Sequence, residues 1–186
     1  MTDTTDPVGK RKGPSPLVRV AGKYGAIAGL VLTVGLIVIY FAGKHPLLIN
    51  ILFDLRILVF LLFIIFALRE FREDFNSRIL HFWQGLYAGI VVYISAAFIT
   101  SLLIWIFASW IEPDFVTSFI EQSLANLGKS KEVIIESLGQ ENYEAAIKGL
   151  PSTTAGNLAF DYFLKSMPIG FILTLITSII MRNKTS

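Results

Sequence analysis

Two charged residues inside a long apolar run are the side chains with the clearest chemical potential in this sequence. Asp54 and Arg56 occur within residues 47–68, a stretch otherwise dominated by Leu, Ile and Phe. A carboxylate or guanidinium near the middle of a membrane span costs about 2.5–3.5 kcal/mol on insertion scales, so such groups usually face protein or water. Two residues apart on one helix, Asp54 and Arg56 would point in different directions and could not readily neutralise each other. Each is therefore predicted to need a partner elsewhere in the chain.

The fourth apolar run supplies candidate partners for both charges. Asp161 and Lys165 lie near its start, at a depth comparable to that of Asp54, which is about 10 Å into the second run at about 1.5 Å per residue. We expect Asp54 to pair with Lys165 and Arg56 with Asp161, while Asn50 extends the polar face above Asp54. We term these five residues the embedded polar cluster. It is either a latch that fixes helix register, or a shallow external cavity that binds a small polar ligand or passes a proton or ion.

Recognisable enzyme motifs are missing from the sequence. The chain contains no cysteine, which excludes thiol catalysis, thiolate metal sites and disulfides. His45 and His81 fall on opposite sides of the membrane in the topology derived below, so they cannot share a site within one subunit. No GxSxG, HExxH, Walker A or dinucleotide-binding glycine pattern occurs. We therefore predict that the protein is not an enzyme and has no catalytic residues, metal site or cofactor.

The elements that position these residues follow from composition. Hydrophobic residues make up 54% and charged residues 16% of the chain, and the mean hydropathy is +0.64, which is typical of a membrane protein. Four apolar runs, at about 24–42, 47–68, 86–110 and 159–181, approach or exceed the ~20 residues that cross a hydrocarbon core as helix. The predicted fold class is all-α, an integral membrane four-helix bundle. Residues 24–186 form this membrane domain, and residues 1–23 form a basic, disordered cytoplasmic tail.

Basic residues orient the bundle, because short segments rich in Lys and Arg stay in the cytoplasm. They are concentrated before the first run, after the fourth run and in the turn between the second and third, at Arg69, Arg72 and Arg78. Only Lys44 lies between the first and second runs. Both termini are therefore predicted to be cytoplasmic. Within the cytoplasmic turn, Arg72 with Glu73 or Asp74 is a further candidate site, although a solvated charge run is the simpler interpretation.

The segment between the third and fourth runs, residues 112–158, is then external and mainly acidic. Its charge argues against binding nucleic acid and against adhesion of a basic helix to anionic lipid. Apolar residues at helical spacing between Pro113 and Gly128 predict a short amphipathic helix, and two more are expected at about 130–139 and 141–148. The segment either folds its apolar stripe onto itself or the membrane surface, or docks a periplasmic partner.

Small residues indicate which helices pack closely, because in lipid they let helix backbones approach. Gly25 and Gly29 form one GxxxG pattern, and Gly85 and Gly89 form another on the same side of the membrane. We expect the two pairs to meet where the first and third runs touch; a homodimer face, or no special role, is the alternative. In the fourth run, a stripe of small residues should face the bundle and a proline should kink or loosen the helix. These residues are Ser166, Gly170, Thr174, Ser178 and Pro168.

Several short strings resemble one family in their order and spacing. They are Tyr24-Gly25-Ala26-Ile27-Ala28-Gly29-Leu30, Arg69-Glu70-Phe71-Arg72-Glu73, Phe82-Trp83-Gln84-Gly85, Ile111-Glu112-Pro113-Asp114-Phe115 and Pro168-Ile169-Gly170. Over about residues 24–184 the chain resembles the bacterial membrane family catalogued as domain of unknown function 4199. The resemblance implies a small four-span bacterial inner-membrane protein and no particular activity. It marks as structural positions Gly25, Gly29, Arg72, Gly85, Gly89, Pro168 and Gly170.

These observations predict a structural or accessory component that acts through helix–helix contacts and its external segment. The expected partners are membrane lipids together with a membrane or periplasmic protein or a second copy of the chain, and not nucleic acid. The alternative is a small ion or solute channel or transporter that uses the embedded polar cluster. A transporter would be expected to show inverted repeats, and the two halves show no convincing similarity. Four spans could still build a pore by oligomerising.

Overall fold

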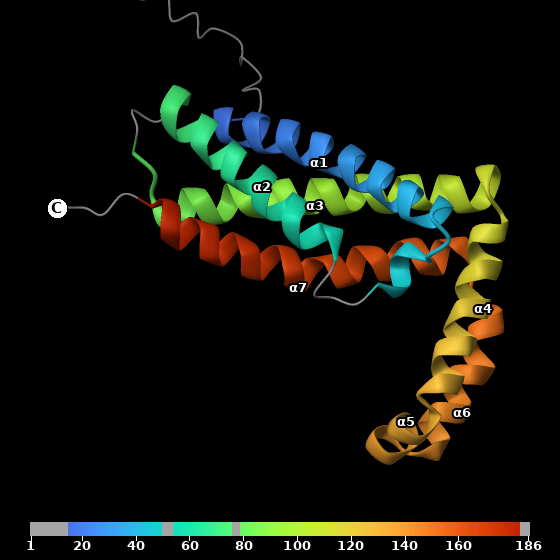
Figure 1. The fold of residues 1–186 in the computed structure, drawn as a ribbon. Helices are drawn as coiled ribbons and strands as arrows, with labels where there is room; N and C mark the ends of the chain where they lie inside the picture. The colour runs from blue at the N-terminus through green and yellow to red at the C-terminus, as the bar shows by residue number, and fades with distance from the viewer. Residues whose placement is uncertain (1–14, 50–53, 76–78, 183–186) are drawn as a thin grey trace, which may run out of the picture.

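The computed structural model describes residues 15–49, 54–75 and 79–182, and every regular element in these ranges is helical. The long helices α1 (Pro16–Phe41), α2 (Leu55–Glu70), α3 (Phe82–Ile106) and α7 (Ala155–Met181) lie side by side and form what we term the helical body (Figure 1). Helix α3 packs against α1, α2 and α7, and α2 also contacts α1 and α7. Asn50 and Arg78 lie outside the described residues.

Three helical stretches among the described residues are long and apolar enough to cross a membrane: Pro16–Phe41, Phe82–Ile111 and Ala155–Met181. The second of them includes η4 (Phe107–Ile111), a π-helical turn that continues α3. Helix α2 does not qualify, since it has 16 residues and a charged π-helical turn, η3 (Phe71–Phe75), follows it. The predicted start of this helix near residue 47 is wrong, because η1 (Pro46–Leu48) is a separate 3-10 turn and α2 begins only at Leu55.

Capping residues, and not the edges of the apolar runs, set the other helix starts. Helix α1 begins at Pro16, before the expected start near residue 24, because Ser15 accepts a hydrogen bond from the Val18 amide (3.4 Å) and proline suits the first helical position. The last part of the tail predicted as disordered is therefore helical. Helix α7 begins where Thr154 accepts from the Asn157 amide (3.2 Å), and it continues through Pro168 to Met181.

The surface of the helical body is apolar as well as its interior. Leu32, Phe60 and Ile64 are completely buried. Facing outward, Leu58 is 64% exposed and Ile180 is 74% exposed. Extensive apolar surface around long apolar helices is unfavourable in water and favourable in hydrocarbon. The body therefore has the properties of a membrane-embedded protein.

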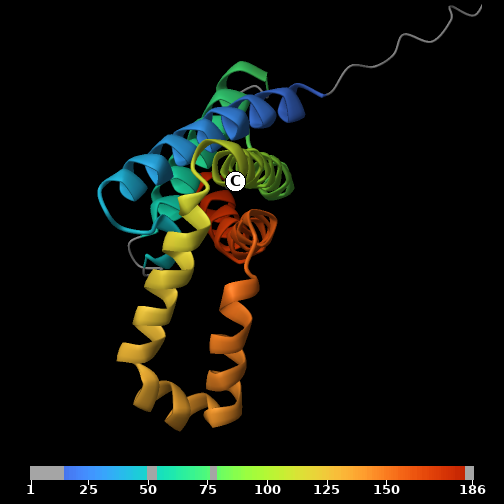
Figure 2. The ribbon, with the colours of Figure 1, turned by 90° about the vertical axis from the view of Figure 1, so that its right-hand side faces the viewer.

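Between α3 and α7 the chain forms a helical arm, made of α4 (Asp114–Lys129), α5 (Lys131–Leu138) and α6 (Gln140–Gly149). The turn η5 (Leu150–Ser152) leads from α6 to α7. These helices lie close to the three ranges expected from the sequence. Helix α4 leaves one end of the body, α5 crosses at the far end and α6 returns beside α4 (Figure 2). The arm runs across the direction of the long helices instead of continuing it (Figure 1).

Candidate functional site

Asp54 and Arg56 pair with each other at the start of α2. Asp54 is the N-cap residue and has an extended backbone (φ −71°, ψ 120°), so it is not on the helix and its carboxylate can turn toward the first helical residues. It accepts hydrogen bonds from the Arg56 amide (2.9 Å) and from Arg56 Nε (2.8 Å to Oδ2). The guanidinium Nη2 completes a bidentate ion pair with the same carboxylate. The side chains are 12% (Arg56) and 13% (Asp54) exposed, so both members of the pair are largely buried.

Arg56 also joins this pair to α7. Its Nη1 donates to Ser166 Oγ (3.2 Å) and to the Tyr162 carbonyl oxygen (3.4 Å). The guanidinium carbon lies 4.8 Å from the centre of the Tyr162 ring, a cation–π distance. Sequence reasoning missed Tyr162. The signal was its four-residue spacing from Ser166, which places the two side chains on one face of α7.

The predicted pairing of Asp54 with Lys165, and of Arg56 with Asp161, is wrong. Lys165 Nζ lies 2.6 Å from Asp161 Oδ2, one turn away on the same helix, and these side chains are 61% and 46% exposed. The prediction failed because it placed Asp54 inside a continuous helix, where it could not have reached Arg56. The structure thus brings Asp54 and Arg56 together with α7, and it forms a second, separate ion pair on the α7 surface.

The Asp54–Arg56 pair has the geometry of a structural contact between α2 and α7. Both charged groups are engaged by each other, by the start of α2 and by α7, so neither presents a free group for proton transfer. The Tyr162 hydroxyl is buried and has no hydrogen-bond partner in the described part of the chain. Among the same residues no group of three His, Asp or Glu side chains could hold a metal ion.

Helices α1 and α3 approach closely at two glycines of α1. A Cβ added at Gly25 would lie 2.7 Å from the Val92 carbonyl oxygen, and one added at Gly29 would lie 3.0 Å from that of Ala96. The close approach lets Thr100 Oγ1 of α3 donate to the Gly29 carbonyl oxygen across the interface (3.1 Å). On α1 the contact with α3 therefore lies at Gly25 and Gly29, as the sequence indicated.

The second GxxxG pattern faces a different helix from the one expected. A Cβ added at Gly85 would lie 3.1 Å from Ser178 Oγ, and one added at Gly89 would lie 2.8 Å from Thr174 Oγ1, both on α7. The expected meeting of the two glycine pairs is therefore wrong, because α3 turns different faces to α1 and α7. The small-residue stripe of α7 does face the body, with Gly170 against the Tyr93 ring and Thr174 and Ser178 fully buried.

A second polar network joins α1 and α2 at the opposite end of α2. Lys23 Nζ and the Tyr24 hydroxyl both donate to the Glu70 carboxylate, at 2.6 and 2.7 Å. Nearby, Arg69 pairs with Glu73 at 3.1 Å through side chains that are mostly exposed. The sequence marked this turn as charged, but it gave no indication that Glu70 binds α1.

His45 connects the body to the arm. It is 2% exposed, its Nε2 lies 3.2 Å from the Phe115 carbonyl oxygen of α4, and its backbone amide donates to Gln122 Oε1 (3.1 Å). Burial lowers the pKa of His45 from 6.5 to about 4, so the ring is neutral at pH 7. His81 caps the start of α3 instead, where its amide donates to Gln84 Oε1 (3.1 Å). The two histidines thus belong to opposite ends of the body, as expected.

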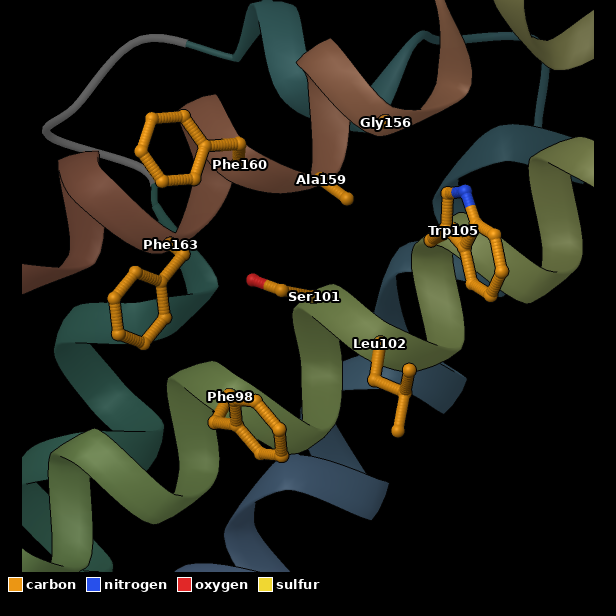
Figure 3. A pocket seen from close by; sticks show the side chains of 8 residues that line it. All are labelled: Phe98, Ser101, Leu102, Trp105, Gly156, Ala159, Phe160 and Phe163. Carbon is orange, nitrogen blue, oxygen red and sulfur yellow. The ribbon is translucent and has the colours of Figure 1, made fainter.

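Figure 3 shows an apolar groove of about 450 Å³ between α3 and α7. Phe98, Trp105 and Phe160 stand around it, and Ser101 points from α3 toward α7 at its base. The buried Ser101 hydroxyl has no hydrogen-bond partner among the described residues. Apart from Ser101 the lining of the groove is apolar, and it includes no charged side chain.

The arrangement of long helices, arm and glycine contacts can be compared with known proteins. Residues 23–183 match the family described as protein of unknown function, DUF4199. The chain belongs to this family. No curated protein and no solved structure matches it. Membership of DUF4199 brings no assigned activity.

Proposed function

We propose that this DUF4199 protein is a four-span protein of the bacterial inner membrane that serves as a structural or accessory component. Three apolar helices supply three crossings, and α2 is the fourth. At about 1.5 Å per residue, α2 is shorter than a hydrocarbon core of ~30 Å. Its Asp54 end therefore lies at depth, where the Arg56 ion pair and the contact with Ser166 make that position tolerable.

The direction of crossing follows from the charges at the two ends of the body. Lys23, Arg69, Arg72 and Arg182 cluster at the end where α1 begins and α7 ends. We place this end in the cytoplasm, with both termini, in accord with the positive-inside rule. The arm then lies on the periplasmic side, along the membrane surface.

The observation that carries the accessory role is the exposed apolar surface at the far end of the arm. Helix α5 has no buried residue, and Val133 and Leu138 are 68% and 62% exposed. Acidic side chains, among them Glu132 and Glu136, accompany them on the same helix. A periplasmic or membrane protein with an apolar patch bordered by basic groups fits this surface, and nucleic acid does not.

The alternative role, conduction of an ion or small solute, would use the embedded charges. In its favour, α2 begins at depth with two ionisable side chains. Against it, the guanidinium and carboxylate are each satisfied and only 12–13% exposed. A pore would therefore require a second copy of the chain to complete it and a rearrangement to free the pair.

The test is purification of the full-length tagged protein from its native membrane in mild detergent, followed by mass spectrometry of stoichiometric partners. The variant Val133→Asp with Leu138→Asp should lose the partner. Its matched control, Lys129→Gln with Lys148→Gln, lowers the charge of the arm by the same amount without touching the apolar surface, and should keep it. A protein purified alone or as a homo-oligomer, together with ion flux in liposomes that Arg56→Gln abolishes, would replace the accessory role with conduction.

A further inference from the structure

Two adjoining cavities lie where the arm meets the body. The first, of about 660 Å³, is lined by Lys44, His45, Gln122 and Asn126 together with apolar groups from the end of α1 and from η1. The second, of about 400 Å³, lies between the helices of the arm. Leu48 and Asn126 line both cavities, so the two lie next to each other.

The first cavity has the chemistry of an anion site. Lys44 is exposed and makes no ion pair with a described residue, and none of the lining residues is acidic. The Gln122 side chain is oriented by its Oε1, which accepts from the His45 amide at 3.1 Å, so its Nε2 is left as a donor. Asn126 adds a second amide. One cation and two side-chain amides thus line the same cavity without a carboxylate, a set of groups that suits a carboxylate or phosphate.

The second cavity has a different character. Leu127 of α4, Ile134 of α5 and Ala146 of α6 give it apolar walls. Ser123 also lines it and is only 8% exposed, and its hydroxyl has no hydrogen-bond partner among the described residues. Ser123, Asn126 and Ser130 are the polar part of a lining that is otherwise apolar.

We propose that these cavities together bind a single-chain anionic amphiphile, such as a fatty acid or a lysophospholipid. Its anionic head contacts Lys44 and the amides of Gln122 and Asn126, and its chain lies in the apolar cavity of the arm. A cavity lined by polar and charged groups lies beside a mainly apolar one, which matches a molecule with an anionic head and an apolar tail. The inference rests on the lining of the cavities and is independent of any partner at Val133 and Leu138.

The test is photolabelling of the full-length protein in detergent with hexadecanoic acid that carries a diazirine on its chain. Peptide mass spectrometry should locate the label on α4, α5 and α6, near Leu127 and Ile134. Unlabelled hexadecanoate and hexadecyl phosphate should compete. Hexadecanol, which lacks the charge, and inorganic phosphate, which lacks the chain, should not.

Variants decide whether the two cavities make the site. Lys44→Gln should weaken labelling at least tenfold, since a hydrogen bond to a charged group is lost, while Lys148→Gln, which changes another exposed lysine, on the arm, should not. Ala146→Trp, which fills the apolar cavity from an exposed position, should abolish chain labelling even if Lys44→Gln folds poorly; thermal melting checks each variant. Labelling that spreads over the body surface, is insensitive to both variants, or is displaced equally by hexadecanol or by inorganic phosphate alone would overturn the proposal.

Discussion

Asp54 and Arg56 neutralise each other across the first turn of α2, although they are only two residues apart in the chain. This is possible because Asp54 is the cap and not a helical residue, so its side chain is free to turn back over the helix start. One consequence is that α2 can begin beside Tyr162 and Ser166 without leaving a charge unpaired. The N-cap of α2 and the ion pair that neutralises its Arg56 therefore form one local structure.

Removing one member of this pair should destabilise the protein far more than removing both. We expect Arg56→Gln to cost roughly 3 kcal/mol, because it leaves a buried carboxylate unpaired, and Asp54→Asn a similar amount. The double variant should recover at least about 1 kcal/mol of the summed loss. Unfolding in mixed detergent measures all three.

The exposed Asp161–Lys165 pair supplies the controls. Asp161→Asn should change the free energy of unfolding by less than about 1 kcal/mol. The effects of Asp54→Asn and Lys165→Gln should be additive, because these two residues do not pair.

The sequence predicted helix positions better than helix ends. Periodic apolar residues and the small-residue stripe on α7 identify elements and faces, because each is repeated many times along the chain. The start of α2 depends on one residue. Asp54 just before an apolar run is a capping signal, but the apolar residues that precede it hid that signal from an interpretation based on hydropathy.

Contacts between elements were less predictable for a related reason. Gly85 and Gly89 show that α3 can be approached closely, yet nothing in their spacing says whether α1 or α7 approaches. That choice depends on the rotation of α3 within the body. Glu70 and Gln122 are likewise ordinary polar residues in the sequence, and only the fold brings them to Lys23 and His45.

The α1–α3 interface predicts opposite effects for two glycines of the same helix. Gly25→Ala would place a Cβ 2.7 Å from the Val92 carbonyl oxygen, which is backbone and cannot yield easily. We expect a loss of about 1–3 kcal/mol. Gly22→Ala meets nothing within 4 Å and should be neutral or stabilise the helix by up to about 1 kcal/mol. Thermal melting in detergent distinguishes the two, and equal melting temperatures would contradict the close contact.

The Lys23–Glu70 network should contribute modestly and should respond to salt. Lys23 is 49% exposed at its side chain, so water screens the ion pair. Glu70→Gln is expected to cost about 0.5–1 kcal/mol at low ionic strength, and less in 0.5–1 M salt. Tyr24→Phe removes only the 2.7 Å hydrogen bond to the same carboxylate, so its smaller loss should be independent of salt. A salt-dependent loss in Tyr24→Phe would contradict the view that Lys23, and not Tyr24, provides the ionic part of this network.

Acid should loosen the joint between body and arm through His45. The folded protein binds the neutral ring, with a pKa of about 4 against 6.5 for a free histidine. The neutral His45 ring therefore makes its full contribution to the free energy of unfolding above pH 6.5, and this contribution declines as the pH falls toward 4. Below pH 4 the free energy of unfolding no longer changes through His45. The total loss between pH 6.5 and 4 is roughly 3 kcal/mol. Melting temperature against pH, compared between the wild type and His45→Phe, isolates this residue from the carboxylates. The difference between the two proteins should change between pH 6.5 and 4. A difference that is constant with pH would mean that the His45 ring is not held neutral against the Phe115 carbonyl.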